Sequence, residues 1–197
     1  MEDSKSDEGR GHKGRVIAAI PCFNEERFIG SVVLKTKKYV DKVIVIDDGS
    51  ADATPDVARD AGGAVYRHER NQGKGAALRS AFQKFMEERA GVLVILDGDG
   101  QHDPGDIPRL VKPVIDGEAD VVIGSRFIGE GRKPPVYRRL GQHVLNVANN
   151  LGSRTKVTDS QSGFRSFSWK AVESLRLTEN GFAVESEIQF AVQRAGL

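Results

Sequence analysis

The segment VLVILDGDGQHD, residues 92–103, joins a run of five apolar residues to three aspartates. Asp97 and Asp99 stand two positions apart, and alternate residues of an extended chain point to the same side. Gly98 between them permits a turn and the close approach of a ligand. Two carboxylates that face one spot repel each other unless a cation is present, and Mg²⁺ takes one or two carboxylates together with phosphate and water oxygens. The segment therefore predicts a divalent-cation site that a diphosphate completes.

Other interpretations of the glycine-rich and acidic segments fit less well. An Asp-Gly pair is also an ordinary turn former. An EF-hand is excluded because its fifth, sixth and twelfth positions hold Gln101, His102 and Pro108. A phosphate-binding loop fails at NQGKGAALRS because Gly75 follows Lys74, where that motif needs Ser or Thr. Lys74 at the start of a helix still favours weak attraction of an anion.

Alternating apolar runs and helical patterns define the elements that must position these residues. Strands are predicted at 15–21, 42–48, 63–69, 92–96 and 119–125, and helices at 25–40, 50–62, 73–91, 104–117 and 185–197. The strands are continuously apolar, as strands buried on both faces must be. Repeated strand–helix–strand units predict an α/β protein with a doubly wound, mainly parallel sheet and helices on both faces. Ser50 and Asp52 are predicted N-caps, and Gly62, Gly91 and Gly196 are predicted helix stops.

Polar residues collect after four of these strands. The segments are PCFNEE, DDGS, DGDGQHD and GSRF, after the first, second, fourth and fifth strand. In an open parallel sheet, ligands bind beyond the carboxyl ends of the strands. We therefore expect these segments to lie along one edge of the sheet, which we call the rim.

The composition narrows the class of protein. The 197 residues suit one domain, predicted at 15–197 after a disordered polar tail at 1–14. Lys and Arg total 29 against 28 Asp and Glu, which gives no reason to expect a nucleic acid partner. The single cysteine, Cys22, is read as a small buried hydrophobe and favours a reducing compartment, hence a cytoplasmic location. No apolar run approaches the ~18 residues of a membrane helix. A further strand would normally follow the last helix, so we expect the domain to be cut short at the C-terminus.

Two segments near the end leave alternatives open. Residues 126–151 are basic and then amphipathic, with a helix predicted at 136–151. This pattern suits either an interfacial helix at anionic lipid headgroups or a helix packed on the sheet. The segment TDSQSGFRSF, 158–167, is predicted to be a polar turn.

Five segments in this order, IPCFNEE, VIVIDDGSADAT, NQGKGAALRSAF, DGDGQHDP and SGFRSF, resemble the motifs of the inverting family 2 glycosyltransferases. That family has the A-type nucleotide-sugar fold, and the resemblance covers about residues 15–195. The motifs are most similar to those of polyprenyl-phosphate sugar transferases of the dolichol-phosphate mannose synthase type. The resemblance implies a catalytic domain that moves a sugar from a nucleotide-diphospho-sugar to a polyprenyl phosphate. It also implies a Mg²⁺ or Mn²⁺ cofactor and a peripheral position at the cytoplasmic face of a membrane.

The resemblance assigns roles residue by residue. The donor nucleotide would contact Pro21, Phe23, Glu25, Asp47, Asp48 and Asp97, with Lys74 as a further donor-binding residue. The divalent ion would be held by Asp97, Asp99 and Gln101. The catalytic set would be Arg126 and Arg165, which face phosphate oxygens, and Asp159, a base or acceptor-side carboxylate.

Elementary electrostatics agrees with this assignment. Negative charge on a departing nucleotide diphosphate is stabilised by a metal ion and by arginines, whose planar forks match phosphate. A lipid monophosphate has a second pKa of about 6 and arrives largely ionised, so the sequence leaves two roles open for Asp159, a base or a carboxylate that orients the acceptor. Phe23 could instead be core, Arg126 and Arg165 surface ion pairs, and Asp159 a turn cap.

Other functions remain in competition at this point. The same donor could serve a saccharide or protein acceptor. A nucleotidyltransferase on a similar sheet would need a basic, Gly-rich loop after the first strand, where this chain has the acidic PCFNEE. A binding module without turnover is the last alternative.

Overall fold

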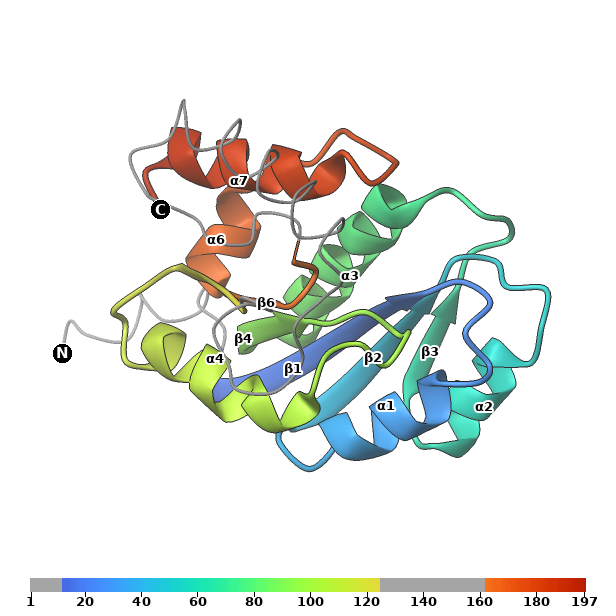
Figure 1. Ribbon diagram of the computed structural model, residues 1–197. Helices are drawn as coiled ribbons and strands as arrows, with labels where there is room; N and C mark the ends of the chain where they lie inside the picture. The colour runs from blue at the N-terminus through green and yellow to red at the C-terminus, as the bar shows by residue number, and fades with distance from the viewer. Residues whose placement is uncertain (1–11, 125–161) are drawn as a thin grey trace, which may run out of the picture.

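A computed structural model describes residues 12–124 and 162–197, which form a sheet between two layers of helices (Figure 1). The strands are β1 (His12–Cys22), β2 (Lys42–Asp47), β3 (Ala64–Arg67), β4 (Ala90–Ile95), β5 (Val121–Ile123) and β6 (Arg165–Ser168). Their order in the six-stranded sheet is β3-β2-β1-β4-β6-β5. The pairs among β1 to β4 are parallel, and β6 is antiparallel to both neighbours. The predicted doubly wound, mainly parallel α/β fold is confirmed.

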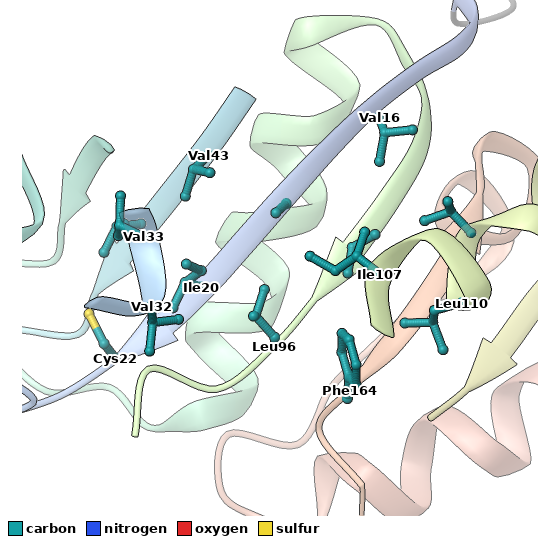
Figure 2. Close-up of a cluster of buried hydrophobic side chains, with 14 of the residues drawn as sticks. Val16, Ile20, Cys22, Val32, Val33, Val43, Leu96, Ile107, Leu110 and Phe164 are labelled. Carbon is teal, nitrogen blue, oxygen red and sulfur yellow. The ribbon is translucent and has the colours of Figure 1, made fainter. Parts of the chain in front are cut away.

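The described helices form two layers, one on each face of the sheet (Figure 1). One layer consists of α1 (Ile29–Thr36), α2 (Thr54–Asp60) and α4 (Ile107–Ile115), the last preceded by a 3₁₀ turn, Pro104–Asp106. The other layer consists of α3 (Lys74–Glu88), α6 (Trp169–Ser174) and α7 (Val184–Ala195). Each layer buries its own hydrophobic cluster against the sheet. Figure 2 shows the first cluster, where Ile20 and Leu96 lie near Ile107 and Phe164.

The central strand β1 explains why the apolar runs are continuous. Ile17 and Ala19 belong to the cluster beneath α3, whereas Ala18 and Ile20 belong to the cluster beneath α1 and α4. All four are completely buried. Because successive side chains of a strand point to opposite faces, a strand covered on both sides needs an apolar residue at every position.

Two strand assignments differ from the prediction. β1 begins at His12, so three residues of the predicted polar tail belong to a strand. β6 begins inside the segment predicted to be a polar turn and extends one residue beyond it, to Ser168. Its polar residues are buried because hydrogen bonds satisfy them: the Ser166 hydroxyl donates to the Leu110 carbonyl at 2.8 Å, and the Phe167 ring fills the core beside it.

Helix ends also differ from the prediction in part. The N-cap of α2 is Ala53 rather than Ser50 or Asp52, and its side chain makes no capping hydrogen bond. Carboxylates bind the first amides instead: the Ala53 amide donates to Glu26 at 3.0 Å, and the Thr54 amide donates to Asp52 at 3.0 Å. α3 ends at Glu88 because Arg89 adopts a left-handed conformation, φ 51°, and Gly91 lies in β4. The stops at Gly62 and Gly196, φ 85° and 68°, are confirmed.

The strand register brings distant segments to the rim. Cys22 of β1 pairs with Asp47 of β2, and Arg165 of β6 pairs with both Ile95 of β4 and Ile123 of β5. Because β6 runs opposite to its neighbours, its first residue meets the carboxyl ends of the parallel strands. The Ser-Gly-Phe segment at 162–164 therefore reaches the same edge as the acidic segment after β4.

The start of α3 is packed tightly against the loop before α7. The Gly75 amide donates to the Asn180 carbonyl at 2.7 Å. A Cβ atom on Gly75 would lie 1.9 Å from the Glu179 carbonyl oxygen, so any side chain there collides with backbone. This contact fixes the first turn of α3, including Lys74, relative to α7.

We expect Gly75→Ala to lower the free energy of unfolding by about 1–3 kcal/mol, the usual cost of overpacking. Helix propensity alone predicts the opposite sign, because Ala is better than Gly in a helix by about 1 kcal/mol. Chemical denaturation measures the difference. Gly181→Ala is the matched control, since a Cβ there meets nothing within 4 Å and should change stability by less than about 0.5 kcal/mol. Equal effects in the two variants would contradict the packing argument.

Candidate active site

The loop after β1 and the loop after β2 are joined by reciprocal hydrogen bonds. The Asn24 amide donates to the Ser50 hydroxyl at 2.9 Å, and the Ala51 amide donates to the Asn24 side-chain oxygen at 2.8 Å. The Glu25 amide donates to the Thr54 hydroxyl at 2.7 Å. Asn24 has φ 56°, a left-handed conformation that Asn tolerates better than most residues. Ser50 and Thr54 thus hold the two loops together, and Glu25 is fixed on the rim.

The two aspartates after β2 are buried and hold backbone. Asp47 accepts from the Ser50 amide at 3.2 Å and forms an ion pair with Arg67, Oδ2 to Nε, at 3.1 Å. Asp48 accepts from the amides of Gln72 and Gly73 at 2.9 and 2.8 Å, and so fixes the loop that leads into α3. Their predicted contacts with the base or ribose stay a prediction.

Carboxylates accumulate at the rim around the end of β4. The pKa of Glu25 is raised from 4.5, first by partial burial and then by the charges of Asp99, Asp52 and Asp97. Asp99 is only partly buried, and its carboxylate accepts a hydrogen bond from the backbone amide of Gln101 at 2.9 Å. The carboxylates around Glu25 therefore create a local negative field, which is the electrostatic setting that a cation site needs.

A closed metal site is absent from residues 12–124 and 162–197, where no three His, Cys, Asp or Glu side chains are grouped to hold an ion. Mg²⁺ does not require one, because it usually keeps several waters and takes one or two carboxylates plus substrate phosphates. The donor set at Asp97 and Asp99, two carboxylates after β4 of which Asp99 is partly exposed, fits such an ion. Gln101 is exposed beside them and would be available as a third, neutral oxygen ligand.

Asp97 also begins a chain of ion pairs that runs inward. Lys74 Nζ lies 2.8 Å from Asp97 Oδ1 and 2.8 Å from Glu185 Oε1. Arg165 Nη2 lies 2.8 Å from Glu185 Oε2. On the other side, His102 Nε2 lies 3.5 Å from Asp97 Oδ2. Burial would raise the pKa of Asp97, but hydrogen bonding to His102 and the charge of Lys74 hold that pKa well below its usual range.

The structure places the remaining predicted residues as follows. Pro21 is buried, and Phe23 is 44% exposed at the rim, so Phe23 is not a core residue. Arg165 is 1% exposed and therefore is not a surface ion pair; it donates to the Ser162 carbonyl at 2.9 Å as well as pairing with Glu185. Its predicted contact with phosphate stays a prediction. Arg126, Asp159 and the basic segment 126–151 lie outside the described residues.

Three residues that contact this site were not recognised from sequence. Glu185 is 4% exposed and comes from α7, far from Asp97 in the chain. His102 lies 3.5 Å from Asp97, and its ring centre is 5.2 Å from that of Phe164. Gly163 packs its backbone on Asp97: a Cβ atom would lie 2.3 Å from Oδ2. The SGFRSF motif was the available signal for Gly163, whereas no spacing links Glu185 to Asp97.

The sequence is similar to a known family and to curated proteins of archaea. Residues 17–176 match the family described as Glycosyl transferase family 2. An uncharacterized protein of Methanocaldococcus jannaschii is 35% identical over 202 residues, which cover all of this chain and 83% of that protein. A UDP-N-acetylglucosamine–dolichyl-phosphate N-acetylglucosaminyltransferase of Methanococcus voltae is 33% identical over 177 residues, covering 79% of this chain and 70% of that enzyme.

A solved structure shows the same architecture. Glucosyl-3-phosphoglycerate synthase from Mycobacterium tuberculosis, in complex with Mn²⁺, UDP-glucose and phosphoglyceric acid, superposes with a TM-score of 0.73 and 25% identity. The superposition covers 92% of this chain and 66% of that one, so the chain spans about two thirds of that structure. The sheet and its rim thus define a glycosyltransferase of the A-type nucleotide-sugar fold. The chain belongs to glycosyl transferase family 2, as its motifs predicted.

We expect Gly163→Ala to lower the free energy of unfolding by about 1–3 kcal/mol, because the new methyl overlaps the Asp97 carboxylate. In an Asp97→Ala background the carboxylate is gone, and the same substitution should cost less than about 0.5 kcal/mol. Denaturant titration of the four proteins gives both differences. An equal loss in both backgrounds would place the clash elsewhere.

The raised pKa of Glu25 gives a pH prediction. A carboxyl group whose pKa is higher in the folded protein binds more protons when folded, so its contribution to stability falls as pH rises through that folded pKa. Glu25→Gln should therefore raise the free energy of unfolding at pH 7, and the gain should vanish below the ordinary pKa of 4.5. Urea melts at pH 7 and pH 4 measure this. Glu118→Gln, at an exposed site, is the control and should show no such difference.

Proposed function

We propose that this protein transfers a sugar from a nucleotide-diphospho-sugar to a polyprenyl phosphate, with inversion at the anomeric carbon. The observation that carries the proposal is the carboxylate edge after β4, where Asp97 and Asp99 raise the pKa of Glu25 and Asp99 is accessible. Family membership supports the donor chemistry. The similar synthase structure, which holds Mn²⁺ and UDP-glucose, supports a divalent cation cofactor.

Asp97, Asp99 and Gln101 would hold the ion, which when bound neutralises the charge that develops on the departing nucleotide diphosphate. The nucleotide would bind against the loops after β1 and β2, which are joined through Asn24, Ser50 and Thr54. The exposed Phe23 ring offers a surface for the base. In the reaction, an acceptor phosphate oxygen forms a bond to the anomeric carbon while the bond between that carbon and the nucleotide diphosphate breaks. The nucleotide diphosphate leaves, and the configuration at the carbon inverts.

A lipid phosphate acceptor needs no general base. The acceptor's second pKa is about 6, so the attacking oxygen is already ionised near neutral pH. Sequence similarity to a dolichyl-phosphate N-acetylglucosaminyltransferase supports this acceptor class. On this proposal, Arg126, Asp159 and the basic segment 126–151 serve the acceptor at the cytoplasmic surface of a membrane. Among the described helices, none is long and apolar enough to cross a membrane.

A small phosphorylated acid is the second candidate acceptor, because the similar synthase structure holds phosphoglyceric acid. The donor half of the reaction would be unchanged. Transfer to a saccharide or protein would need a base to take a proton from a hydroxyl group. A nucleotidyltransferase is disfavoured because the loop after β1 is acidic, with Glu25 and Glu26 where phosphates would need positive charge.

The direct test is transfer of labelled sugar. We expect radiolabel from UDP- or GDP-sugars to enter an organic-extractable product when polyprenyl phosphate and Mn²⁺ or Mg²⁺ are present, and chelation by EDTA to abolish it. A second outcome is that the label stays water-soluble with every polyprenyl phosphate tested and yet is transferred to phosphoglyceric acid. That result would show that the acceptor is the small phosphorylated acid and not the lipid. No transfer to any acceptor, with donor intact, would overturn the proposal.

Asp99→Ala should reduce transfer by at least about 100-fold, the scale on which loss of transition-state electrostatic groups acts. The variant should remain folded, because Asp99 makes only a local contact to Gln101. Asp106→Ala is the matched control, an exposed aspartate at the end of the 3₁₀ turn whose loss should leave the rate unchanged. Circular dichroism confirms folding, and unchanged turnover in Asp99→Ala would contradict the cation site.

A further inference from the structure

We propose that Lys74 is an internal counter-cation of Asp97, which a divalent ion must displace, and that Glu185 retains the displaced ammonium. This inference rests on the cation site of the proposed function and concerns how that site fills. It makes Lys74, Glu185 and Arg165 positioning residues for Asp97. It also assigns a role to the ion-pair chain that donor binding alone does not explain.

The geometry of Lys74 carries the inference. Its ammonium group lies 2.8 Å from carboxylate oxygens of both Asp97 and Glu185, and its side chain is only 15% exposed. The Phe182 ring centre lies 6.0 Å from Nζ on a further side. Lys74 therefore contacts one carboxylate oxygen of Asp97, which is a predicted ligand of the divalent ion. The ammonium group also contacts the carboxylate of Glu185, which can retain it.

The charges balance along the chain of ion pairs. Asp97 and Glu185 contribute two negative charges, and Lys74 and Arg165 contribute two positive charges. Arg165 is buried, and it fixes Glu185 through both the carboxylate, at 2.8 Å, and the Glu185 carbonyl, at 3.2 Å. The carboxylate of Glu185 is thus held in place whether or not Lys74 also contacts Asp97.

A divalent ion at Asp97 would put two positive charges beside the ammonium group. Like charges disfavour that arrangement, so Lys74 and the ion compete for Asp97. A donor diphosphate changes the balance, because it brings negative charge to both cations. The site therefore binds a free divalent ion weakly and binds the ion together with a nucleotide diphosphate more strongly.

The test measures Mn²⁺ binding without nucleotide or acceptor, by electron paramagnetic resonance of free Mn²⁺. Lys74→Met should bind Mn²⁺ about tenfold more tightly than the unmodified protein, within the range of about 5–150-fold typical of coupled sites. Lys84→Met is the matched control, because Lys84 lies on the same helix, pairs with Glu87 and is away from the rim. Its Mn²⁺ affinity should be unchanged. Equal affinities in all three proteins would overturn the proposal.

A double-mutant cycle separates direct competition from the general field of the lysine. In an Asp97→Asn background, Lys74→Met should change Mn²⁺ affinity by less than about twofold, because the shared carboxylate is gone. Tenfold tighter binding in that background as well would show that Lys74 acts only through space, and the exchange at Asp97 would be wrong. Lys74→Arg, which keeps the charge, should retain the weak affinity.

A measurement on the unmodified protein covers the case in which Lys74→Met fails to fold. The ¹⁵N signal of the Lys74 ammonium, assigned with Lys74→Arg, should shift saturably as Mg²⁺ is added, whereas that of Lys84 should not. A Lys74 signal that stays in place at saturating Mg²⁺ would overturn the proposal. Because none of these measurements uses a donor or acceptor, loss of sugar transfer with the exchange intact would count against the proposed function alone.

Discussion

The arrangement of the rim depends on one partly buried carboxylate. Asp97 stands at the carboxyl end of β4, where the sheet delivers it into a position enclosed by Lys74, His102 and the backbone of Gly163. An ionised group in such surroundings is stable only with partners of opposite charge. The partners come from α3, from the loop after β4 and, through Glu185, from α7. The packing of three separate segments is therefore organised around a single charge.

The antiparallel strand β6 makes this convergence geometrically feasible. A parallel strand in that position would begin at the far edge of the sheet, and the segment before it would be remote from β4. Because β6 runs the other way, Ser162, Gly163 and Phe164 arrive beside the acidic loop, and Arg165 pairs with Ile95 at its first residue. The same reversal directs the Arg165 side chain toward Glu185.

Sequence reasoning recovered the fold and the acidic edge because both follow from local patterns. Continuous apolar runs identify strands covered on two faces, and strand ends identify the rim. β6 was missed because Ser166 is buried by a hydrogen bond to Leu110, which composition does not reveal. The contacts of Asp48 with Gln72 and Gly73, and of Lys74 with Glu185, were missed because they join segments with no shared periodicity or spacing.

The position of Glu185 in α7 has a consequence for biosynthesis. A ribosome delivers the β1–β4 half of the chain first, and α7 emerges near the end of the described residues. Until then Lys74 and Arg165 have no Glu185 to pair with, and the loop that carries Asn180 cannot close on Gly75. The nascent protein thus completes its ion-pair chain only after α7 has been synthesised, and partly synthesised chains lack the fully assembled rim.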